Sequence, residues 1–312
     1  MSCLYSITEA ENIISTKISL FILGSGSDER TLSMMNLISA KQKCISYILL
    51  IKYDSFDEST IIAAFPYSKL EVIDANSNQI SFLNSLSKYQ CTFKSDSILV
   101  DITSIRIPEM FILFKYLQYN NPKAQLHVAY SSPIEYEFPE EPFTSYHSYY
   151  GNLNTTDVLG YSGISDDMSQ NQMIIFLGFE GVLSEKVNED VQYSVLKLVN
   201  NLPSFYEKYK DISIINNYNL LATGQDKLYF VPANNPFETY NFLSKQISEN
   251  ETVCIAPLST KPVALGVCLY ALHHESVRVV YPMAERYMSH RANSVHKTYI
   301  YTIGLDRMNP LP

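Results

Sequence analysis

The chain has 312 residues, 46% hydrophobic and 18% charged, which is too apolar for a disordered protein and long enough for two ordinary domains. Its 32 acidic residues outnumber its 23 basic ones, and the formal net charge of −9 excludes a broad basic face for duplex nucleic acid. The five cysteines form no CxxC pair, and neither a signal peptide nor a membrane-length apolar run is found, so we expect a cytoplasmic protein without membrane or metal site.

The first half of the chain has the pattern of a parallel α/β domain. Short, nearly continuous apolar runs alternate with amphipathic stretches of helical period, as expected when helices cover both faces of a sheet. The predicted strands are 18–24, 45–51, 70–74, 97–101 and 125–130. The predicted helices are 28–40, 57–65, 78–88 and 107–119. Pro108 suits the first turn of the last of these helices.

A segment rich in Ser, Tyr, Asp and Pro follows, over 131–172, and its acidic residues gather near the start. It shows no clear periodicity, so we interpret it as an acidic linker, with a solvated spacer favoured over a lid. Beyond it the apolar runs return. The predicted strands of the second half are 173–178, 212–216, 228–232, 252–256, 277–281 and 298–303.

Five landmarks of the first half recur in the same order in the second, each displaced by roughly 150–160 residues, as loop insertions in a duplicated unit would produce. The pairs are Leu23-Gly24 with Leu177-Gly178, Ala75-Asn76 with Ala233-Asn234, Phe82-Leu83 with Phe242-Leu243, Thr103 with Ser259, and Tyr130 with Tyr281. We therefore predict two tandem Rossmann-like, three-layer domains related by internal duplication. Their predicted bounds are 1–130 and 173–312.

Ligand sites of open parallel sheets lie beyond the carboxyl ends of the strands, so residues that follow strands are the candidate site residues. After the first strand, the turn Gly24-Ser25-Gly26 and the nearby Arg30 offer backbone N–H groups and a guanidinium to an anion. Arg30 is equally compatible with a surface ion pair. The matching turn of the second half, from Gly178 to Gly181, lacks the arginine.

The fourth strand of each half is followed by the most informative segments. In the first half, Asp101, Thr103, Ser104 and Arg106 place a carboxylate, two hydroxyls and a guanidinium at a strand-to-helix junction. In the second, Ser259, Thr260 and Lys261 open a helix, where hydroxyls, free N–H groups and an ammonium suit a phosphate. Plain N-capping by the hydroxyls is the alternative, and it needs no ligand.

Basic residues also gather near the C-terminus. They are Arg278, Arg286, His290, Arg291, His296 and Lys297. Tyr281, Tyr287, Tyr299 and Tyr301 lie among them. The cluster predicts either an anion-binding segment with stacking rings or, more in keeping with most charge runs, a solvated face.

Several of these segments resemble a known family. LGSGS at 23–27, DITSIRIP at 101–108 and STKPVALG at 259–266 are similar to motifs of CARF domains, the CRISPR-associated Rossmann-fold sensors, and of their two-copy SAVED relatives. The matching positions are Asp101, Thr103, Arg106 and Pro108 for one CARF pattern, and Thr260 and Lys261 for another. Ser104-Ile105 and Leu258-Ser259 stand where those patterns carry glycines, which puts close backbone approach to a ligand in doubt.

The resemblance implies a sensor of prokaryotic antiviral defence in which paired units hold a cyclic oligonucleotide, with a separate effector protein as partner. Three functions stay open. We favour a nucleotide-binding sensor or accessory subunit without a cofactor, followed by a protein-interaction subunit with an idle site. The third is a nucleotide-processing enzyme, phosphodiesterase-like or phosphoribosyltransferase-like, for which Asp101 and Glu180 are weak acid/base candidates.

Overall fold

The chain folds into two compact units. The computed structural model describes residues 6–9, 17–26, 29–41, 45–53, 56–76, 78–90, 92–136, 149–163, 172–222, 227–248, 251–287 and 292–306. The first unit combines Met1–Glu137 with Ser289–Pro312, and the second is Phe138–Met288.

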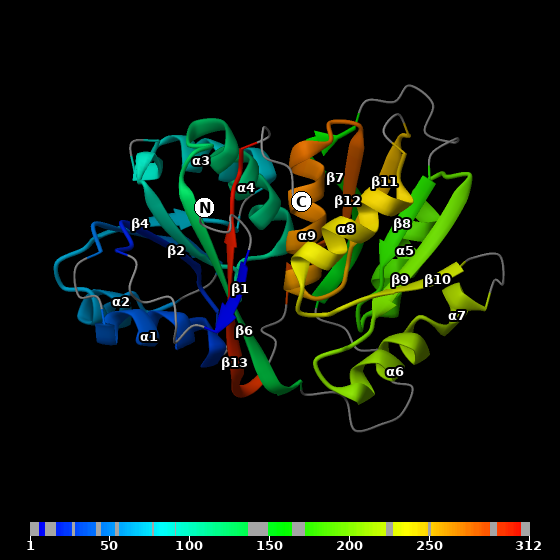
Figure 1. Cartoon of the computed structure of the whole chain (residues 1–312), viewed down its shortest axis with the longest axis horizontal. Helices are drawn as coiled ribbons and strands as arrows, with labels where there is room; N and C mark the ends of the chain where they lie inside the picture. Colours follow the sequence, from blue (N-terminus) through cyan, green and yellow to red (C-terminus); the bar gives the residue numbers. More distant parts are fainter. Residues whose placement is uncertain are drawn as a thin grey trace. The chain divides into compact units, whose positions relative to one another are not determined.

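A seven-stranded sheet forms the centre of the first unit (Figure 1). Its strands are β1 (Ser6–Glu9), β2 (Leu20–Gly24), β3 (Tyr47–Lys52), β4 (Lys69–Asp74), β5 (Ser97–Asp101), β6 (Gln125–Tyr136) and β13 (Ala292–Ile303). They are arranged in the order β1-β13-β6-β5-β2-β3-β4. The five strands from β6 to β4 are mutually parallel, whereas β13 runs antiparallel to both of its neighbours.

Helices cover both faces of this sheet. They are η2 (Glu29–Leu32), α1 (Ser33–Lys41), α2 (Ser59–Ala64), α3 (Gln79–Ser87), η3 (Thr92–Lys94) and α4 (Ile107–Asn120). Met34 and Ile38 of α1 and Ile61 of α2 join Phe21 and Leu50 in one buried cluster. The helices α3 and α4 pack together on the other face (Figure 1). The three-layer arrangement follows from the double-sided burial of β2 and β5.

The second unit repeats this architecture with a six-stranded sheet. Its elements are β7 (Tyr149–Ser162), β8 (Gln172–Phe176), α5 (Gly181–Asp190), β9 (Val195–Asn201), α6 (Glu207–Asn216), α7 (Tyr218–Leu221), β10 (Lys227–Val231), α8 (Pro236–Gln246), β11 (Val253–Pro257), α9 (Lys261–His273) and β12 (Val277–Tyr287). The strand order is β10-β9-β8-β11-β12-β7, and only β7 is antiparallel to its neighbour.

The parallel core has the same topology in both units. When its five strands are numbered along the chain, their order across the sheet is 3-2-1-4-5 in each unit. The predicted fold class, two Rossmann-like α/β domains, is therefore confirmed. In this topology the chain turns to opposite sides of the sheet after the first and fourth strands, which makes their carboxyl ends the switch point where such sheets bind ligands.

The antiparallel strand beside each core is not the strand that directly follows the fifth core strand in the sequence. β7 follows β6 in sequence but pairs with β12 in the second unit, whereas β13 follows β12 but pairs with β6 in the first. The predicted division at 130 and 173 is therefore wrong. The fifth strand of the first unit runs to Tyr136, β7 lies inside the supposed linker, and the last strand belongs to the first unit.

One further element was predicted incorrectly. The apolar run at 212–216 lies in α6, and the strand at this place in the order is β9, over 195–201. A five-residue apolar run is compatible with either a strand or a buried helix segment, so periodicity alone does not separate them. Among the residues described, no helix is both long enough and apolar enough to cross a membrane.

Candidate functional site

The turn after β2 and the loop after β5 meet at the switch point of the first unit, because these two strands are hydrogen-bonded neighbours. A Cβ atom on Gly24 would lie 2.7 Å from the backbone carbon of Ser104, and one on Gly26 would lie 3.1 Å from the Ser104 Oγ. Oγ1 of Thr31 and Oγ of Ser104 are 2.6 Å apart and complete the contact. The glycines therefore allow the 102–106 loop to lie against the turn.

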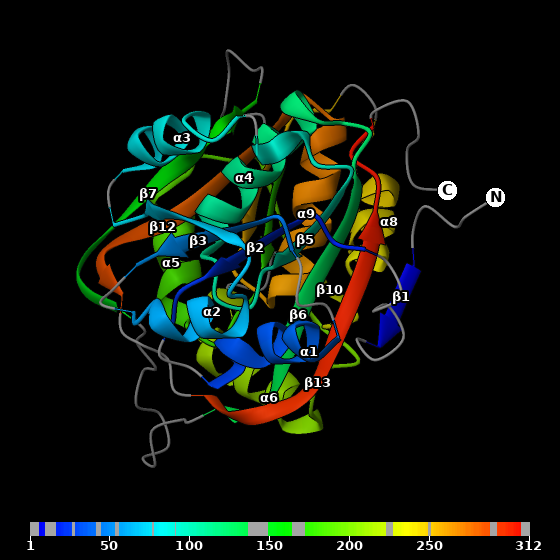
Figure 2. The same ribbon diagram turned by 90° about the vertical axis from the view of Figure 1, so that its left-hand side faces the viewer.

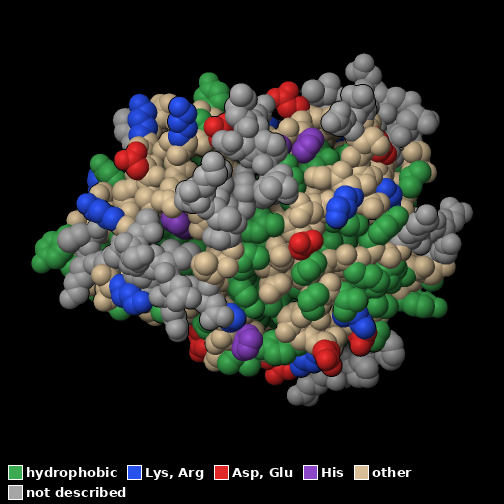
Figure 3. Space-filling model, in the orientation of Figure 1, with side chains coloured by type: hydrophobic (Ala, Val, Ile, Leu, Met, Phe, Trp, Pro, Cys, Tyr) green, Lys and Arg blue, Asp and Glu red, His purple; other side chains and the backbone are tan. Residues whose placement is uncertain are grey.

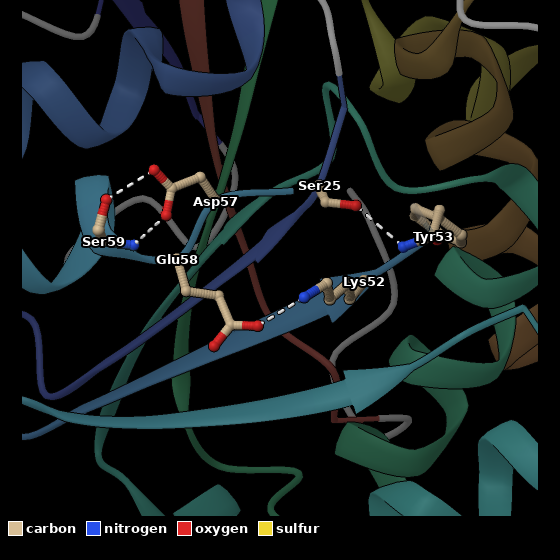
Figure 4. A network of polar contacts seen from close by, with 6 residues as sticks. All are labelled: Ser25, Lys52, Tyr53, Asp57, Glu58 and Ser59. Carbon is tan, nitrogen blue, oxygen red and sulfur yellow. Dashed lines mark hydrogen bonds and ion pairs between the residues drawn. The ribbon is translucent and has the colours of Figure 1, made fainter. Parts of the chain in front are cut away.

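Ser25 ties the same turn to the end of β3. Its backbone N–H donates to the carbonyl of Ile51 at 2.7 Å, and its hydroxyl accepts the N–H of Tyr53 at 2.9 Å (Figure 4). The neighbouring loop is held by the ion pair of Lys52 with Glu58 at 2.7 Å. With 3% of its surface exposed, Ser25 positions the turn.

Asp101 and Thr103 form a buried unit at the end of β5. The Asp101 Oδ1 accepts hydrogen bonds from the Thr103 N–H at 3.0 Å and from its hydroxyl at 2.5 Å. The Thr103 Oγ1 in turn accepts the N–H of Ser131, which lies within the buried part of β6. This arrangement joins the end of β5 to the middle of β6.

The two candidate arginines both lie against tyrosine rings. The Arg106 guanidinium carbon is 4.2 Å from the centroid of the Tyr53 ring, and the Arg106 backbone N–H donates to the Tyr53 hydroxyl at 3.0 Å. Arg30, 7% exposed, donates through Nη1 to the carbonyl of Ser131 at 3.3 Å, and its guanidinium carbon is 5.5 Å from the centroid of the Tyr136 ring. Both centroid distances are within the range of cation–π contacts, which hold a guanidinium against a ring.

The second unit has the same close approach at its own switch point. A Cβ atom on Gly178 would collide with the carbonyl oxygen of Leu258, as one on Gly24 would collide with Ser104. The carbonyl of Gly178 accepts hydrogen bonds from Ser213 at 3.0 Å and Asn217 at 2.9 Å.

The predicted phosphate-binding cluster of the second unit makes protein contacts. Thr260 is the N-cap of α9, accepting the Val263 N–H at 3.5 Å, and its hydroxyl donates to the carbonyl of Ala233 at 2.6 Å. The Ser259 hydroxyl accepts from Asn201 at 2.7 Å, and Lys261 is the first residue of the helix. The capping interpretation therefore accounts for the Thr260 side chain.

The acid/base candidates belong to different units. Asp101 is 2% exposed in the first unit, and Glu180 is partly exposed at the N-cap position of α5 in the second. Burial, with a smaller contribution from Glu180, raises the pKa of Tyr149. Burial also raises the pKa of Cys254 to about 12, so this thiol is not a nucleophile at neutral pH.

The basic cluster near the C-terminus is divided between the units. Arg278 of β12 forms an ion pair with Asp157 at 2.6 Å in the second unit, whereas His296 and Lys297 of β13 lie in the first. His290 and Arg291 lie outside the described residues, as does the Arg286 side chain. On the face in Figure 3, Lys and Arg side chains are scattered.

The sequence did not point to Tyr53, Ser131 or Thr298, yet these residues hold the candidate arginines and the β5 loop in place. Ser131 could have been chosen as the polar residue after the predicted strand 125–130. Thr298 could not, because it is 167 residues away from its partner Ser131. No cluster of His, Cys, Asp and Glu suited to a metal ion occurs among the described residues. Comparison with models of protein families and with curated proteins finds no match to this chain.

Proposed function

We propose that this chain is a nucleotide-binding sensor or accessory subunit whose first unit recognises a phosphate-bearing nucleotide, with cyclic oligonucleotides as the leading class. The supporting observation is the pair of arginines, Arg30 and Arg106, that lie against tyrosine rings beside the glycine-containing turn at the switch point. The carboxyl edge at a switch point is where open α/β sheets bind their ligands. Guanidinium groups are the side chains best suited to bidentate recognition of phosphate.

The bonding of Asp101 supports binding rather than turnover. Its Oδ1 already accepts two hydrogen bonds from Thr103, an arrangement that holds the loop between β5 and α4. A general base must come within hydrogen-bond reach of the substrate proton, and Asp101 is only 2% exposed. We therefore assign Asp101 a positioning role and expect the bound nucleotide to be recovered unchanged.

The first prediction concerns Arg106. A panel of cyclic di-, tri- and tetranucleotides is added to the protein, and the melting temperature is read at saturating concentration. We expect at least one member to raise it, and Arg106→Gln to weaken that member about tenfold or more, since a hydrogen bond to a charged group contributes about 1.5–3 kcal/mol.

Lys123→Gln is the matched control. It removes the same charge from an exposed turn before β6, at the amino ends of the parallel strands, whereas Arg106 follows the carboxyl end of β5. Chromatography of the nucleotide after incubation separates binding from turnover. The proposal is rejected if no nucleotide changes the melting temperature, and a released product would replace it with catalysis.

A further inference from the structure

A groove lies between α1 and β13 in the first unit, outside the turn and loop described above. The two elements lie next to each other in Figure 2 and are in contact. The volume is about 860 Å³, within the usual range for small-molecule sites. The lining residues are Glu29, Ser33, Asn36, Leu37, Ala40 and Lys41 on one wall, with Ser294, Val295, His296, Lys297 and Thr298 on the other.

The groove depends on an irregularity in β13. The pairing of β13 with β6 shifts register between Val295 and Lys297, and Ser294 has a φ of 54°, in the left-handed region. In a regular strand, alternate side chains point to opposite faces, but five consecutive residues of β13 line this groove. Bulges of this kind redirect side chains next to binding sites.

The charge of the groove is opposite to that of the whole chain. Lys41 and Lys297 come from opposite walls and His296 adds an imidazole, whereas Glu29 is the one acidic residue that lines it. The formal net charge of the chain is −9. A groove with two ammonium groups on such a molecule favours an anion with more than one negative charge.

The floor of the groove is hydrogen-bonded to the β5 loop. The hydroxyl of Ser33 lies 3.3 Å from that of Thr298, which lies 2.9 Å from that of Ser131. The Ser131 N–H donates to the Thr103 hydroxyl at 3.0 Å, and Thr103 donates to Asp101. Thr298 and Ser131 are 8% and 0% exposed, so these polar groups form a built, buried network beneath the groove.

We propose that the nucleotide recognised by the first unit extends into this groove, with one phosphate between Lys41 and Lys297 and a hydroxyl towards Ser33 and Thr298. The inference rests on the proposed function. It assigns the nucleotide a binding site with residues from two distant parts of the sequence. The hydrogen-bonded network connects this groove with the loop that contains Arg106.

The test compares two double variants in the melting experiment, with the same panel of cyclic nucleotides as probes. Lys41→Gln/Lys297→Gln removes both groove charges, and we expect affinity to fall by about tenfold or more, as for other charge-assisted phosphate contacts. Lys88→Gln/Lys123→Gln removes the same charge at two exposed positions away from the groove and is expected to keep affinity. The melting temperature without ligand checks that all variants fold.

A second measurement needs no variant. The bound nucleotide is expected to protect Lys41 and Lys297 from acetylation by an amine-reactive ester, read by mass spectrometry, while Lys88 and Lys123 react as before. Suppose that Arg106→Gln abolishes binding, while Lys41→Gln/Lys297→Gln keeps its affinity and the nucleotide does not protect these lysines from acetylation. The groove assignment is then wrong and the proposed function stands. If the unmodified protein binds no nucleotide, both are rejected.

Discussion

Gly24 shows how much of the candidate site is determined by a single missing side chain. The sequence suggested that the glycines of this turn open the backbone to an anion. Instead, the backbone of Ser104 occupies the space where a Cβ atom would stand. A sequence reveals that a position tolerates no side chain, but whether a ligand or another loop fills the space depends on contacts between residues 80 positions apart.

At this scale we predict that Gly24→Ala destabilises the first unit by about 1–3 kcal/mol, the usual cost of overpacking. The clash is with backbone atoms, 2.7 Å away, that move only with the whole 102–106 loop. Gly26→Ala is the comparison, because its nearest neighbours are the Thr31 and Ser104 hydroxyls, and we expect it to cost less. Urea unfolding measures both; a neutral Gly24→Ala would show that the loop yields.

At the scale of elements, predictability followed burial. The buried parallel strands β2, β3 and β5 were found because both faces require apolar side chains. In β7, YYGNLNTTDVLGYS, the buried residues are Val158 and Tyr161, which are not consecutive, so no hydrophobic run marks this strand. Its partner β12 begins at Val277, and such long-range pairing has no local signal.

A histidine in the pair of β6 and β13 predicts how the free energy of unfolding depends on pH. Burial lowers the pKa of His127, whose Nδ1 lies 3.1 Å from the Thr302 hydroxyl of β13. Below pH 6.5, the ordinary value, the unfolded chain binds a proton that the folded chain does not, so stability is lost as the pH falls towards the lowered pKa. We expect the free energy of unfolding to fall less between pH 7.5 and 5.5, measured in urea, in His127→Asn.

The same substitution at the exposed His296 is the matched control for this slope. An unchanged pH dependence in His127→Asn would mean that His127 takes up its proton equally in the folded and unfolded chain.

At the scale of the whole molecule, the main difference from the predicted organisation is that the chain returns to the first unit with β13. The α/β class of the two cores was predictable, because the strands and helices of each core follow one another in the sequence. The pairing of β13 with β6 and of β7 with β12 was not, because a strand with one unpaired edge is compatible with either sheet. Two halves of the sequence therefore do not correspond to two halves of the structure.

The pairing of β13 with β6 predicts that truncation near the C-terminus affects the first unit. A protein that ends at residue 288 lacks β13, which leaves the edge of β6 unpaired and removes the partner of β1. By hydrogen exchange we expect the amides of β6 to lose protection while those of β8 and β11 keep theirs. A chain that ends at Asp306 retains β13 and is the control. Equal loss in both units would contradict the assignment of β13.

The pairing of β13 with β6 also sets an order of events at the ribosome. The nascent chain completes β6 at Tyr136, but β13 begins only at Ala292, 292 − 136 = 156 residues later. At about 5–20 residues per second, this interval is roughly 8–30 s. Throughout this interval β6 lacks its partner strand on one edge, and an unpaired strand edge is a template for pairing with other chains.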